Sequence, residues 1–239
     1  MSDTATTPLS GDPVVAPADP VRSDPRRYRD AAYEHGAAAA LVLLHTEAVP
    51  GVLPAGPGGH VFVPLTVEAV CDRHETPTGP RARESGAAEE FLGRIPSGEQ
   101  EMIALRVAGS GPVPAGDTPG AWPTGLAWIR LGLADRLVEQ AAAHLRGRTV
   151  QNTVTLNLAL VRAMLADAVG GTTEARALLG GPPTARTLRR VHRSLDETGR
   201  ICLHLFGATG YLTGGPGSEV RVSELLADTY APSTDPERP

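Results

Sequence analysis

Several residue types that ligate metal ions lie close together in the first half of the chain. Cys71, Asp72, His74 and Glu75 fall within one short segment, and His60 precedes them. Thiolate, imidazole and carboxylate groups bind zinc, but structural zinc sites repeat their ligands at short, regular spacing. Because these residues show no such repeat, the sequence predicts no metal site.

Other reactive residue types also lack the context that catalysis requires. Ser85-Gly86 and Ser110-Gly111 are not nucleophile elbows, because neither lies in a Gly-x-Ser-x-Gly motif. The chain has no Gly-x-Gly-x-x-Gly or Walker motif for a nucleotide. His144 and His192 fall in helical patterns with polar faces, so we expect them to be surface residues.

Composition restricts the partners and the compartment. All 22 Lys and Arg positions are arginine, and the formal net charge is −5. Without a basic stripe this balance predicts no nucleic-acid partner. Two cysteines do not make a disulfide framework, and no signal peptide or apolar run of about 20 residues occurs. We therefore expect a cytoplasmic protein that does not contact a membrane.

The chain divides into four regions. Residues 1–27 and 233–239 are rich in Pro, Asp, Ser and Glu, so we expect disordered tails. Residues 28–120 contain short apolar runs between Gly and Pro, which predicts a partial β-rich domain. The runs at 60–65 and 102–107 are typical of strands, whereas 37–45 fits either a helix end or a strand. Residues 121–232 form the predicted helical bundle.

Apolar residues recur at three- and four-residue spacing throughout this last region. The first stripe runs from Leu126 to Leu145 and a second from Val154 to Ala168, where Gly170-Gly171 is expected to interrupt the helix. Thr184 is a plausible N-cap for a third helix that Gly207 ends. A fourth, shorter helix covers residues 218–229. Short connections between these helices predict an antiparallel bundle.

Two segments near the end of the chain carry a recognisable pattern. Residues 206–211 read Phe-Gly-Ala-Thr-Gly-Tyr, and Tyr230-Ala231-Pro232 follows the fourth helix. With the rest of residues 125–232 they resemble the C-terminal bundle of the acyl-CoA dehydrogenase family. In that family a Gln-x-x-Gly-Gly-x-Gly-aromatic turn precedes a Tyr-Glu-Gly loop. The resemblance implies a mainly α fold, an acyl-CoA dehydrogenase-like antiparallel bundle preceded by a partial β-domain.

The resemblance also implies a place for FAD. In the family an Arg-x-x-Phe-Gly motif ends the first bundle helix, and its arginine reaches the FAD pyrophosphate of a neighbouring subunit. Here the arginine is present and Gln151-Asn152 replaces Phe-Gly. A guanidinium neutralises pyrophosphate, and glycine admits backbone N–H groups to a phosphate. Taken alone, such residues cap a helix or complement its dipole. The cofactor-binding candidates from the resemblance are Arg148, His204, Gly207 and Gly210.

The catalytic base of the family is absent from both of its known positions. The glutamate of the Tyr-Glu-Gly loop corresponds to Ala231, and the alternative glutamate on the first bundle helix corresponds to Ile129. Neither side chain can accept a proton. A slip in the alignment would involve Glu219 or Glu224, which otherwise fit solvated helix charges.

Three functional interpretations follow from this pattern. The first is a partner subunit in a homo- or hetero-oligomer with a complementary acyl-CoA dehydrogenase-like chain, acting on an acyl-CoA or acyl-carrier substrate. The second is an enzyme repurposed for non-redox chemistry on a carrier-bound intermediate. The third is a non-catalytic scaffold.

Overall fold

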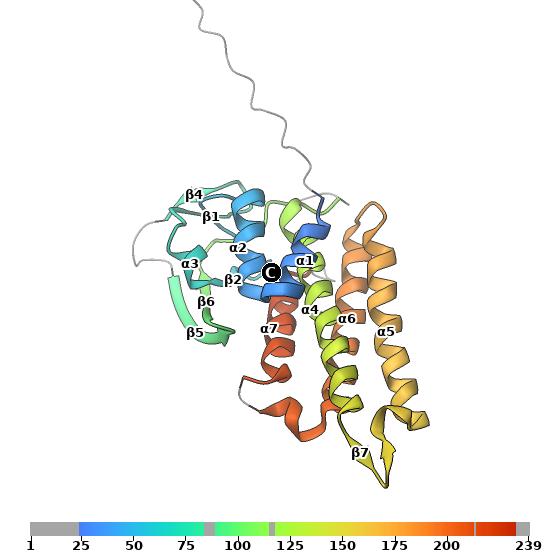
Figure 1. Cartoon of the computed structure of the whole chain (residues 1–239). Helices are drawn as coiled ribbons and strands as arrows, with labels where there is room; N and C mark the ends of the chain where they lie inside the picture. Colours follow the sequence, from blue (N-terminus) through green and yellow to red (C-terminus); the bar gives the residue numbers. More distant parts are fainter. Residues whose placement is uncertain (1–23, 84–88, 115–117, 213, 233–239) are drawn as a thin grey trace, which may run out of the picture.

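The computed structural model describes residues 24–83, 89–114, 118–212 and 214–232. The predicted C-terminal tail and residues 1–23 of the predicted N-terminal tail lie outside these ranges, while helix α1 begins at Arg26. Figure 1 shows a small β part on one side of the molecule and a group of long helices on the other. The mainly α class with a smaller β part is confirmed.

The β part consists of two small three-stranded sheets with strand orders β1-β3-β4 and β2-β6-β5. β2 and β5 both pair antiparallel with β6. Both predicted strands are present. β5 was not predicted from the sequence, because its side chains are mostly exposed and give no hydrophobic alternation. The elements are β1 (Val52–Leu53), β2 (His60–Pro64), α3 (Leu65–Glu68), β3 (Arg73–His74), β4 (Arg81–Ala82), β5 (Glu89–Ser97) and β6 (Gln100–Val107).

The helical part follows the predicted apolar stripes. The side chain of Thr184 caps α6 by accepting a 3.1 Å hydrogen bond from the Thr187 N–H. Within the described ranges no helix combines the length and apolar character needed to cross a bilayer. The elements are α4 (Ala121–Arg146), β7 (Thr149–Val150), β8 (Thr153–Val154), η1 (Thr155–Asn157), α5 (Ala159–Leu179), α6 (Ala185–Phe206), η2 (Gly207–Tyr211) and α7 (Pro216–Tyr230).

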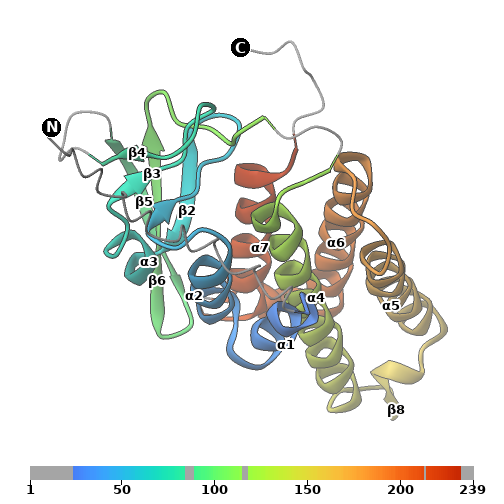
Figure 2. The same ribbon diagram turned by 90° about the horizontal axis from the view of Figure 1, so that it is seen from above.

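Helix α4 lies at the centre of this arrangement. Every residue from Gly125 to Ala134 is buried, so this half of the helix is covered on all sides. α1, α2, α5, α6 and α7 all pack against it, as the view from above in Figure 2 shows. Its second half buries only the stripe of Leu137, Ala141 and Leu145 and their neighbours. Most other helices are therefore positioned by their contact with α4.

The segment that was predicted to be β-rich begins with two helices, α1 (Arg26–His35) and α2 (Ala37–Ala48). The prediction was ambiguous at 37–45, because a short apolar run has no period that separates helix from strand. Alanine-rich sequence favours a helix. α1 lies against α4 at Gly132, where any side chain would collide with the backbone carbonyl of Arg29. These helices share one core with α4 and the β part.

Helix α5 is continuous through Gly170-Gly171, so the predicted interruption there is wrong. A Cβ at Gly171 would collide with the hydroxyl of Thr198 on α6. The Ser194 hydroxyl also donates to the Gly171 carbonyl at 3.1 Å. The glycine therefore lets two helices approach closely, and the packing outweighs its cost of about 1 kcal/mol to helix stability.

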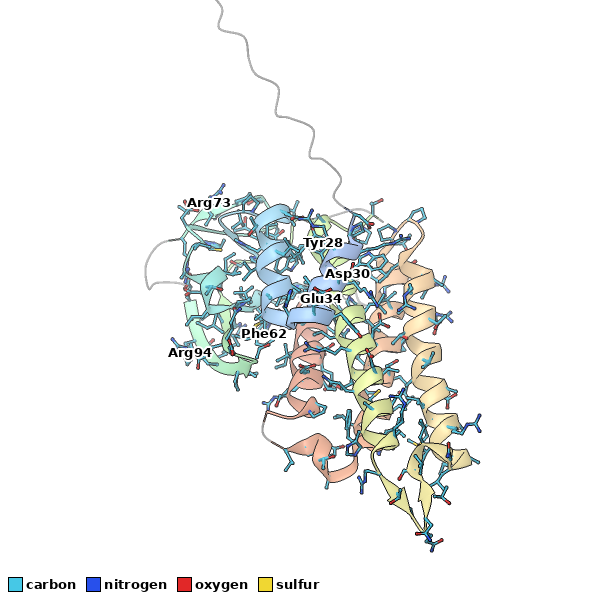
Figure 3. All side chains as sticks on the ribbon, viewed as in Figure 1. Tyr28, Asp30, Glu34, Phe62, Arg73 and Arg94 are labelled. Carbon is cyan, nitrogen blue, oxygen red and sulfur yellow. The ribbon has the colours of Figure 1, made fainter. Side chains whose placement is uncertain are left out.

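Tyr230 joins the bundle to the β part. Its fully buried hydroxyl accepts a 3.0 Å hydrogen bond from the backbone N–H of Phe62 on β2. It also lies 3.3 Å from the Phe62 carbonyl and 3.4 Å from that of Pro54. The Trp122 ring packs edge-on against Tyr230, with 5.6 Å between centroids. Figure 3 shows Phe62 on the side of the β part that faces the helices.

Replacing Tyr230 with Phe should lower the free energy of unfolding by about 1–3 kcal/mol, because the Phe62 N–H would remain buried without this acceptor. Urea denaturation followed by circular dichroism measures the change. Tyr211→Phe is the control: its side chain is 70% exposed, so we expect less than about 0.5 kcal/mol. Equal effects of the two substitutions would contradict the role given to Tyr230.

Candidate functional site

Arg148 and Gly207 lie at the same end of the helical part. Arg148 is exposed just after α4, and its Nη1 is 3.3 Å from Nε2 of His144. The His144 ring packs against Phe206, the last residue of α6, with 5.3 Å between centroids. The structure thus places Arg148 at the same end of the helical part as His204, Gly207 and Gly210, which lie at or just after the end of α6.

A short hairpin follows Arg148, where the sequence predicted that the second helix would begin almost at once. β7 and β8 pair antiparallel, and η1 separates them from α5. Gln151 and Asn152 form the turn with φ values of 48° and 61°. Two positive φ values match the right-handed twist of a tight hairpin. The backbone carbonyl of Arg148 accepts from the N–H and hydroxyl of Thr155 at 2.8 and 3.1 Å, which fixes the start of the hairpin.

The turn after α6 combines an open glycine and a packed one. Gly207 has φ 59° and ψ −141°, which an L side chain rarely adopts, and no described atom lies within 4 Å of the position of a Cβ there. Gly210 is buried, and a Cβ would lie 3.0 Å from the Cβ of Phe206. His204 is exposed in the last turn of α6. Arg148, His204 and Gly207 are thus open to an external group, whereas Gly210 contributes to packing.

The two expected base positions lie away from this end. Ile129, in the first half of α4, is completely buried in the core. Ala231 is half-buried and caps α7, donating its N–H to the Ala227 carbonyl at 2.8 Å, next to Tyr230 and the first turn of α4. At 1.5 Å per residue, the 26 residues of α4 span about 39 Å. One compact ligand within this chain cannot contact both Ala231 and Arg148.

A buried polar network lies directly beside Ile129. The guanidinium of Arg130 is fully buried and pairs with Asp196 on α6. It donates to the Ser223 hydroxyl on α7 at 2.9 Å and to Nδ1 of His192 at 2.8 Å. Burial lowers the pKa of Arg130, and Asp196 opposes that shift. The network ties α4, α6 and α7 together through one cation.

His192 is buried, so the prediction that it is a surface residue is wrong. Burial, followed by the charge of Arg130, lowers the pKa of His192 to about 3. The ring is therefore neutral at pH 7. Because Nδ1 accepts from Arg130, the proton resides on Nε2, which has no hydrogen-bond partner among the described atoms. The apolar stripe of α6 packs into the core, and this packing brings His192 against Arg130.

Glu219 and Glu224, the carboxylates that a slipped alignment would use, line a small cavity together with Arg130 and Ser223. The cavity holds about 20 Å³, which is room for one water molecule. Glu219 pairs with Arg136, and Glu224 lies 4.0 Å from Arg200. An acyl chain cannot enter this space, so the geometry gives neither carboxylate access to a substrate there.

Cys71 in the β part and His45 on α2 do not form a reactive pair. Sγ of Cys71 lies 3.3 Å from Nε2 of His45. Burial raises the pKa of the Cys71 thiol to about 11 and lowers the pKa of His45. The thiol is therefore protonated at neutral pH and is not a nucleophile. Among the described residues no three His, Cys, Asp or Glu side chains are grouped as metal ligands.

Comparison with known proteins identifies the fold. The sequence matches no family model and no curated protein. A putative acyl-CoA dehydrogenase from Mycobacterium smegmatis is 13% identical, with a TM-score of 0.53 over 79% of this chain and 72% of that chain. The acyl-CoA dehydrogenase from Slackia heliotrinireducens is 15% identical, with a TM-score of 0.50 over 74% and 60%. The ChsE4-ChsE5 complex from Mycobacterium tuberculosis gives 15% and 0.49 over 67% and 52%.

The chain therefore has a divergent acyl-CoA dehydrogenase-like fold, as its sequence predicted. It spans 52% of the ChsE4-ChsE5 chain and 72% of the Mycobacterium smegmatis chain. Because the sequence identities are only 13–15%, the structural similarity establishes the fold and nothing further. The assignments of Arg148, His204, Gly207 and Gly210 to a cofactor remain predictions.

The low pKa of His192 should make the protein less stable in mild acid. Its pKa is about 3 in the folded state and about 6.5 when unfolded, so stability is lost as pH falls through that window. Between pH 8 and pH 5 the loss from this residue is about 2 kcal/mol. Urea denaturation should show that His192→Gln removes this part of the pH dependence, whereas His35→Gln, at an exposed position, leaves it. Unchanged pH dependence in His192→Gln would contradict the neutral buried imidazole.

Restoring a carboxylate should have very different costs at the two base positions. Ile129→Glu places a carboxylate in the core without a designed partner, and we expect a loss of about 3–5 kcal/mol. Ala231→Glu lies at a half-buried helix end and should cost less than about 1 kcal/mol. Thermal and urea unfolding of both variants measure the difference. Similar costs would show that Ile129 is not the core residue described above.

Proposed function

We propose that this acyl-CoA dehydrogenase-like chain is a partner subunit of an FAD-dependent acyl-thioester dehydrogenase. In this proposal another chain supplies the base and most of the cofactor pocket. One observation supports the proposal. The two expected base positions are apolar, whereas the cofactor candidates Arg148, His204 and Gly207 are exposed near one end of the helical part.

The exposed end has the chemistry needed to contact a phosphate held by another subunit. The Arg148 guanidinium offers several N–H donors, and its side-chain contact with His144 is long at 3.3 Å. The open face of Gly207 lets a phosphate approach the backbone without meeting a side chain. Bound FAD would supply the hydride acceptor of the reaction. Residues of this chain would bind the pyrophosphate of FAD, and the other chain would supply the group that removes the proton.

The apolar base positions explain why a second chain is required in this proposal. Proton abstraction by a positioned side chain contributes about 10²–10⁴-fold to such reactions. Ile129 is enclosed by the core, and Ala231 has no group that accepts a proton. Glu219 and Glu224 face a space for one water molecule. The substrate class expected for the assembly is an acyl-CoA or an acyl-carrier thioester.

Arg148→Ala should weaken FAD binding in an assembly with a complementary acyl-CoA dehydrogenase-like subunit. A charge-assisted contact is worth about 1.5–3 kcal/mol, so the affinity should fall roughly 10- to 150-fold. FAD titration followed by flavin fluorescence measures the change, with melting temperature checked alongside. Arg146→Ala is the matched control, because it removes a neighbouring exposed arginine in the last turn of α4. The FAD affinity of the Arg146→Ala assembly should change less than about threefold.

Equal FAD affinities for wild type and Arg148→Ala would remove the cofactor role. Arg148 would then only complement the helix dipole, which is worth less than about 1 kcal/mol and affects stability alone. The non-catalytic scaffold would become the preferred function.

A further inference from the structure

An open groove runs between α5 and α6 on the outer side of the helical part. Its volume is about 750 Å³. The lining includes Arg186, Arg189, Arg190 and Arg193 on α6, and Asp167 and Glu174 on α5. We call it the arginine groove. It involves none of the residues discussed for FAD, and the inference below does not depend on the proposed function.

The arginines form a row because of their spacing. Arg186, Arg190 and Arg193 are separated by four and three residues, so they share one face of α6. The helical rise of 1.5 Å places the first and last about 10 Å apart along the axis. Overall composition, with net charge −5, gave no sign of a basic stripe. Helical geometry concentrates these cations locally.

Two members of the row have their donors available. Glu174 accepts from Nε of Arg190 at 2.6 Å and lies 3.4 Å from the Ser194 hydroxyl, so this carboxylate is occupied. Arg186 and Arg193 are exposed, and no salt bridge within the described part of the chain involves either one. Like charges at such spacing repel each other. A ligand with two or more negative groups would relieve this repulsion.

The character of the lining indicates a macromolecular ligand of mixed charge. Small-molecule pockets are mostly apolar, whereas Ile201 is the one large apolar residue lining this groove. Arginine is enriched at protein interfaces. Asp167, Glu174 and Glu197 lie in the same groove and would repel the continuous phosphates of a nucleic acid. A second copy docked symmetrically would place two arginine rows against each other.

We propose that the arginine groove binds an acidic helical segment of a partner protein. Such a segment presents carboxylates on one face at positions i and i+7, which match the spacing of Arg186 and Arg193 on α6. A basic residue between its carboxylates would face Asp167. Arg186 and Arg193 supply bidentate contacts at the two ends of the row.

A synthetic peptide tests this proposal on the full chain. The probe is a fluorescein-labelled helical peptide of Ala, Lys and Glu with glutamates at those spacings, and binding is followed by fluorescence anisotropy. The double variant Arg186→Glu/Arg193→Glu should bind it at least about tenfold more weakly than wild type. The control, Arg81→Glu/Arg106→Glu, makes the same charge change at exposed positions of the β part and should stay within about twofold. Circular dichroism confirms that both variants are folded.

Four results would overturn the proposal. They are failure of the wild type to bind the peptide, equal losses in both double variants, equal binding of a peptide with Gln in place of Glu, and tighter binding of duplex DNA of the same charge. A change of oligomeric state in Arg186→Glu/Arg193→Glu, measured by sedimentation, would instead identify the groove as a contact between copies of this chain. None of these results would change the outcome expected for FAD titration of Arg148→Ala, so the two proposals are tested separately.

Discussion

The burial of α4 on all sides is the constraint on which the rest of the structure depends. Helices from both ends of the described chain pack against its first half, and the β part joins the same core. A charged side chain in such an enclosed helix is stable only when it is paired and hydrogen-bonded. Arg130 pairs with Asp196 and donates to Ser223 and His192. The cost of desolvating Arg130 is thereby offset by contacts to two further helices. α6 and α7 are held in position as a result.

The same enclosure separates structural and functional regions along α4. Its first half is core, so Ile129 belongs to the packing. Its second half is only partly covered and ends at exposed residues, where His144 packs against the end of α6 and Arg148 lies beside His144. The residues that we propose for FAD contact lie near this end.

The sequence predicted the bundle because long amphipathic stripes and the Thr184 cap are local signals. It could not separate helix from strand at residues 37–45, or recognise the exposed strand β5, because neither segment has a distinctive period. Gly170-Gly171 was misread because close packing against α6 outweighs helix propensity. The exposed candidates Arg148 and His204 were found by resemblance alone. Burial of His192 depends on tertiary contact with Arg130, which no local pattern encodes.

We propose that this chain contributes to a flavin site that another chain completes. The most direct measurement is the flavin-to-protein ratio, from absorbance at the flavin band, of the chain purified alone and of its complex with a complementary acyl-CoA dehydrogenase-like subunit. We expect stoichiometric flavin in the complex and little flavin on the isolated chain. Stoichiometric flavin on the isolated chain, reduced when an acyl-CoA is added, would contradict the account and reveal a complete active site within it.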